Sequence, residues 1–130
     1  MDNPLGLARD TEAAMNDFIG RLAKAQRLSG KRAPSLCDTR DSYVQQSRLS
    51  VNTQPVARPN LHRENALSAL RRFIESAERY RQEALAGGPR RSWNSYEDQR
   101  LRKPISRLRY LLVQHDRWEA FRRLHSNGAV

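Results

Sequence analysis

Apolar residues in the first 28 positions recur at steps of three and four, which is the spacing of one face of an α-helix. Asn3 is a residue type that favours the N-cap, and Pro4 suits the first helical position because its missing N–H has no helical partner there. Ser29 and Gly30 follow as a stop signal. The pattern therefore predicts that residues 1–28 form an N-terminal helix that begins at Pro4. Its four basic and four acidic residues balance, which indicates a structural role.

The region 61–88 shows the same period more clearly. Its apolar face runs from Leu67 to Ala84, and arginines and glutamates four residues apart lie on the other side, where they support the helix weakly. Gly87 and Gly88 end the pattern. We predict a central amphipathic helix over residues 61–88 whose charged side chains form a solvated face.

Residues 29–60 show no helical period. They are rich in Ser, Thr, Asn, Gln and Arg, and prolines stand at positions 34, 55 and 59. A connection of this length is unusual inside a compact domain, so we predict a flexible basic linker or arm. Alternatively, the short run 48–52 adds as a strand to the sheet edge of a partner protein.

The C-terminal segment, residues 89–130, carries two apolar faces. One face includes Leu101 and the other includes Tyr110, so a single straight helix would be apolar on two sides. Pro104 is expected to break or kink any helix that runs through it. Either a new short helix starts near Asp116, or the second apolar face is a subunit contact in a homodimer. Both readings predict one all-α domain, a small bundle of three or four helices.

Basic charge is concentrated in this last segment. The chain has 24 Lys and Arg against 14 Asp and Glu, which gives a net charge of +10 and a pI of about 10.9. Residues 89–130 hold ten of the basic residues and four of the acidic ones, hence +6 of the total. Such an excess destabilises a compact chain by self-repulsion unless an anionic partner neutralises it. The chain should therefore bind something acidic.

Arginine dominates the basic residues, since only three of them are lysines. Arginine forms bidentate hydrogen bonds to phosphate and carboxylate groups and stacks on aromatic rings and bases, whereas lysine acts as a point charge. This preference suits phosphate recognition. It also fits the codon usage of a GC-rich genome, and the sequence does not separate the two explanations.

Patterns that would indicate catalysis are missing from the sequence. Cys37 is the only cysteine, so no intramolecular disulfide is expected. His62, His115 and His125 lack the spacing that places two metal ligands on one helical turn, and no glycine-rich phosphate loop is present. The acidic residues mostly occupy salt-bridge positions. We therefore expect a protein that is not an enzyme and needs neither cofactor nor metal.

Neither a secretory signal nor a membrane span is expected. The first residues lack a basic region followed by an apolar run, and no stretch approaches 18 apolar residues. A cytoplasmic protein is predicted, or a nuclear one if the source is eukaryotic.

The basic residues of the C-terminal segment are interleaved with aromatic ones. Arginines spaced along a helix neutralise phosphates, and aromatic rings stack on exposed bases. We therefore predict a helical accessory protein that binds nucleic acid, DNA or RNA, through contacts largely independent of base sequence. The predicted contact residues are Arg90, Arg91, Trp93, Arg100, Arg102, Lys103, Arg107 and Arg109.

Two other functions fit the same charge. In one, the protein is an adaptor or inhibitor, of the kind that phages, viruses or plasmids encode, and docks its basic face on an acidic partner protein. In the other, it binds the surface of an anionic membrane. Selectivity distinguishes the first of these from nucleic-acid binding, because one defined acidic protein should then compete far better than bulk nucleic acid.

Overall fold

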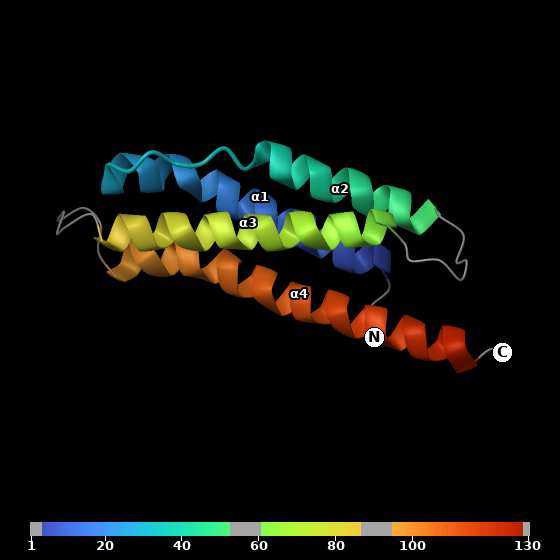
Figure 1. The fold of residues 1–130 in the computed structure, drawn as a ribbon. Helices are drawn as coiled ribbons and strands as arrows, with labels where there is room; N and C mark the ends of the chain where they lie inside the picture. The colour runs from blue at the N-terminus through green and yellow to red at the C-terminus, as the bar shows by residue number, and fades with distance from the viewer. Residues whose placement is uncertain (1–3, 53–60, 87–94, 129–130) are drawn as a thin grey trace.

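Four helices lying side by side make up the described part of the chain (Figure 1). The computed structural model describes residues 4–52, 61–86 and 95–128. Within these residues there is no strand, so the predicted all-α bundle is confirmed. The helices are α1 (Pro4–Ser29), α2 (Cys37–Asn52), α3 (Leu61–Ala86) and α4 (Ser95–Gly128). The long helix α3 packs between α2 and α4, while α1 packs mainly against α4.

The two helices with a clear apolar period form as predicted. α1 begins at Pro4 and ends at Ser29, one residue beyond the expected end. Gly30 follows in the left-handed region, with φ of 73°, and its N–H donates to the carbonyl oxygen of Gln26 at 3.0 Å. Glycine adopts this conformation without a steric penalty, which explains the stop signal. α3 begins at Leu61 as predicted and is described up to Ala86.

The prediction for residues 29–60 is wrong over Cys37–Asn52, which form α2. The inward face of this helix carries Tyr43, Ser47 and Ser50, and Leu36 packs just before its first turn. These positions have helical spacing, but serines read as polar, so the period is invisible in a hydropathy pattern. The run 48–52, considered above as an added strand, is therefore helical. The last part of the predicted arm, residues 53–60, lies outside the described residues.

The chain between α1 and α2 is held by hydrogen bonds. The hydroxyl of Tyr80, on α3, donates to the carbonyl oxygen of Lys31 at 2.8 Å. The backbone N–H of Ala33 donates to the side-chain oxygen of Gln26 at 2.7 Å. Residues 30–36 are thus fixed to two helices, and this part of the predicted arm is an ordered connection.

The expected break at Pro104 is absent, and α4 runs without interruption from Ser95 to Gly128. Proline has no N–H, so the carbonyl of residue 100, four positions earlier, loses its helical donor. Arg21 of α1 supplies one, because its Nη1 donates to the Arg100 carbonyl oxygen at 2.9 Å. The alternative of a new short helix starting near Asp116 is therefore wrong as well.

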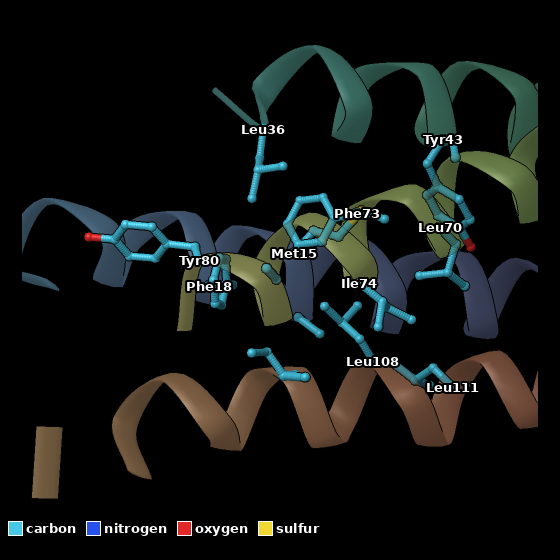
Figure 2. Packing of buried hydrophobic residues seen from close by; sticks show 14 of the residues in the cluster. Met15, Phe18, Leu36, Tyr43, Leu70, Phe73, Ile74, Tyr80, Leu108 and Leu111 are labelled. Carbon is cyan, nitrogen blue, oxygen red and sulfur yellow. The ribbon is translucent and has the colours of Figure 1, made fainter. Parts of the chain in front are cut away.

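The core lies along the axis of the bundle and draws side chains from all four helices (Figure 2). At its centre Phe18 of α1 meets Phe73 of α3 edge to face, with ring centroids 5.9 Å apart and an interplanar angle of 73°. α4 contributes Leu108 and Leu111, and α2 contributes Tyr43. This arrangement leaves part of the surface of α4 facing solvent, and four of the predicted contact residues are exposed there: Arg102, Lys103, Arg107 and Arg109.

Candidate functional site

Five of the eight predicted contact residues lie in the described part of α4. These are Arg100, Arg102, Lys103, Arg107 and Arg109. Arg90, Arg91 and Trp93 lie outside the described residues. The structure divides the five into two groups, one that lines a shared hollow and one that pairs with acidic residues.

Arg100, Arg102 and Lys103 line an open hollow of about 540 Å³ on the surface formed by α1 and α4, together with Arg21 of α1. We call this surface the basic hollow. Four of its seven lining residues are cationic, and none is acidic. The other three, which are polar, are Tyr96, Gln99 and Ser106. The lining therefore combines concentrated positive charge with hydrogen-bonding side chains.

Two of these cations form no ion pair with a described acidic residue, although Lys103 shares a neighbouring hollow with Asp10 and Asp17. Arg102 and Lys103 are exposed, and among the described residues no carboxylate lies within ion-pair distance of either. Arg100 is half-buried and lies over an aromatic ring, with its guanidinium carbon 5.9 Å from the ring centroid of Tyr96. Its charge is likewise not neutralised by a carboxylate in the described chain. These three positive charges are available to an anion.

Arg21 is held in place from both sides. Its Nε donates to a carboxylate oxygen of Asp17 at 2.8 Å, and its Nη1 donates to the Arg100 carbonyl oxygen. The guanidinium is thus fixed at the edge of the basic hollow, and the Arg21 side chain as a whole is 25% exposed. Sequence reasoning assigned α1 a purely structural role because its charges balance, and so it missed Arg21. The only signal in the sequence was Pro104, which requires a donor from elsewhere for that carbonyl.

Arg107 and Arg109 belong to the second group. Arg107 lies 4.0 Å from a carboxylate oxygen of Asp10 on α1, and Arg109 lies 3.6 Å from one of Glu78 on α3. Both arginines are about half exposed. Exposed pairs of this kind contribute little to stability, so they open at small cost when a stronger anion approaches. Neither residue lines the basic hollow.

His115 lies on the opposite side of α4 and is partly buried. Its Nε2 is 2.9 Å from the hydroxyl oxygen of Tyr43 and 3.2 Å from that of Thr11. Burial lowers the pKa of His115 to about 4, and the positive charge of Arg63 acts in the same direction. The imidazole is therefore neutral at pH 7 and joins α1, α2 and α4 in a polar network. This is a structural role.

Metal binding and membrane crossing find no support in the described residues. No three His, Cys, Asp or Glu side chains among them gather in a way that would hold a metal ion. Across the same residues, each helix is too polar or too short to span a bilayer. No protein-family model matches this chain, and searches of curated proteins and of solved structures give no significant match.

Proposed function

We propose that this protein binds nucleic acid through the basic hollow, with contacts to phosphates that are largely independent of base sequence. The observation that carries the proposal is the lining itself, which combines Arg21, Arg100, Arg102 and Lys103 without an acidic side chain. A cationic surface of this kind attracts the charged backbone of a polynucleotide. The guanidinium groups of Arg100 and Arg102 add bidentate hydrogen bonds to phosphate oxygens.

The geometry of α4 supports backbone contacts over base reading. Arg102 and Lys103 lie on an exposed, regular helix, and Arg100 is steadied by Tyr96 beside it. If the three available cations neutralise three phosphates, the logarithm of the affinity should fall with the logarithm of salt concentration with a slope of about −2 to −3. Such a slope would distinguish charge neutralisation from an apolar mode of binding.

Fluorescence anisotropy with labelled single-stranded RNA, single-stranded DNA and duplex DNA, each at several salt concentrations, tests this proposal. The double variant Arg102→Glu/Lys103→Glu should lose at least about tenfold in affinity and show a shallower salt slope. A matched control is Arg72→Glu/Arg79→Glu, which changes net charge equally on the α2–α3 side, where Asp38 and Glu75 line the surface as well.

Comparing the two variants distinguishes binding at a specific site from an effect of net charge. Loss confined to the α4 variant supports the basic hollow as the binding site. Equal loss in both variants would mean that net charge alone causes the binding, and unchanged affinity in the α4 variant would remove the site assignment.

One observation favours the alternative, docking on an acidic protein. Besides Tyr96, three large apolar side chains in the described part of α4 are exposed, with exposed fractions of 55% for Tyr110, 47% for Val113 and 73% for Leu124. Apolar contacts with a basic surround are typical of protein interfaces. Replacing Val113 and Leu124 with serine should abolish such docking and leave oligonucleotide binding unchanged. Sedimentation of the same variant tests the predicted homodimer, which stays a prediction.

A further inference from the structure

Two exposed tyrosines on α4 each have an arginine over the ring. The guanidinium carbon of Arg100 is 5.9 Å from the ring centroid of Tyr96, and that of Arg107 is 5.7 Å from the ring centroid of Tyr110. The two tyrosines are 63% and 55% exposed. An aromatic ring beside a planar guanidinium offers two flat surfaces on which a base can stack. Stacking on paired bases is blocked, because their faces already contact neighbouring base pairs.

The two tyrosine–arginine pairs face the same way. Tyr96 and Tyr110 are fourteen residues apart in one continuous helix, which corresponds to about 21 Å along its axis and places them within about 40° of each other around it. Lys103 lies midway between them on the same side. The order along the helix is therefore aromatic, basic, aromatic. At the duplex spacing of about 3.4 Å per nucleotide, about six steps and hence about seven nucleotides reach from one ring to the other, and a more extended unpaired strand needs fewer.

We infer that this surface binds an unpaired strand of nucleic acid, with bases stacked on Tyr96 and Tyr110 and the backbone phosphates between them held by the basic side chains. We call the surface the Tyr–Arg stripe, defined by Tyr96, Arg100, Lys103, Arg107 and Tyr110. The inference rests on the proposed nucleic-acid function and goes further by naming the class of ligand. Arg107 takes part because its pair with Asp10, 4.0 Å long and half exposed, opens easily.

The test compares an unstructured oligonucleotide, oligo-dT or oligo-U, with a blunt duplex that carries the same label. Tyr96→Ala and Tyr110→Ala should each weaken binding of the unpaired strand by about fivefold or more. Tyr110 lies outside the basic hollow, so Tyr110→Ala should leave binding of the duplex unchanged, whereas Tyr96→Ala should weaken binding of the duplex less than binding of the unpaired strand. Tyr96→Phe and Tyr110→Phe keep the ring and should bind like the unaltered protein. In a length series, affinity should rise steeply up to a length of at most about seven nucleotides and more slowly beyond.

Tyrosine rings and charges are tested separately, so two kinds of failure can be told apart. If Arg102→Glu/Lys103→Glu weakens binding while both alanine variants bind as before, nucleic-acid binding stands and the stripe is overturned. Equal losses for unpaired strand and duplex in the alanine variants also overturn it. If no oligonucleotide binds at physiological salt, the proposed function itself is wrong. Circular dichroism confirms that the variants fold, which is expected because both rings are exposed.

Discussion

Replacing Arg21 with methionine should destabilise the protein, because it removes a hydrogen bond to a backbone carbonyl oxygen of α4. Pro104 leaves the Arg100 carbonyl without its helical donor, and Arg21 Nη1 donates to it at 2.9 Å. Methionine keeps an apolar stem of comparable length and removes the donor. Leaving a buried carbonyl group without its charged donor lowers the free energy of unfolding by about 1–3 kcal/mol. This carbonyl is partly open to water, so we expect a loss of about 1–2 kcal/mol.

The effect should depend on the residue at position 104. Pro104→Ala restores a backbone N–H that can donate to the Arg100 carbonyl within the helix, and proline inside a helix costs about 3 kcal/mol relative to alanine. Pro104 is buried, so part of that gain is offset by lost packing. In the alanine background Arg21→Met should cost less than in the proline background, by about 1 kcal/mol.

The assay is urea denaturation of the four proteins of this cycle, followed by circular dichroism at 222 nm. The free energy of unfolding comes from each midpoint at a common slope. Lys24→Met serves as the control, because Lys24 pairs with Glu97 at 3.4 Å, whereas the described side chain that donates to the Arg100 carbonyl oxygen is that of Arg21. It should cost the same in both backgrounds. If Arg21→Met also costs the same in both, Arg21 does not compensate for the proline, and the explanation of the unbroken helix α4 fails.

Three further predictions concern the buried network, the end of α1 and the core. His115 has a folded-state pKa of about 4, below its usual 6.5. The contribution of His115 to the free energy of unfolding is therefore full above pH 6.5 and falls by up to about 3 kcal/mol as the pH drops towards 4. His115→Gln should flatten this dependence in urea titrations between pH 7 and 4. Gly30→Ala should destabilise the protein by about 1 kcal/mol, because the φ of Gly30 is 73°. Gly20 lies in open space within α1, so Gly20→Ala should stabilise the protein by up to about 1 kcal/mol. Thermal melts measure both effects. Phe73→Ala removes the ring that meets Phe18 and should cost about 3–5 kcal/mol in the same melts.

Each of these three has a clear contrary result. An unchanged pH dependence in His115→Gln would mean that other groups cause the acid sensitivity. Equal effects at Gly30 and Gly20 would remove the conformational explanation of the helix end. A loss below about 1 kcal/mol in Phe73→Ala would indicate that the core repacks around the missing ring.

Part of this protein was determined by its sequence alone. The ranges of α1 and α3 could be predicted because their buried faces consist of apolar residues, so the helical period appears in the linear pattern. The placement of Arg100, Arg102 and Lys103 on one basic helix also followed from the sequence, because neighbours in a helix stay neighbours in the fold.

Tertiary contacts decided the rest. α2 forms because α3 packs over a face made of Tyr43 and serines, and no hydropathy pattern reveals such a face. α4 continues through Pro104 because a donor comes from Arg21, 79 residues away in sequence. The same contact brings Arg21 into the basic hollow. Which arginines stay unpaired depends likewise on carboxylates of other helices, and their positions follow only from how the helices pack.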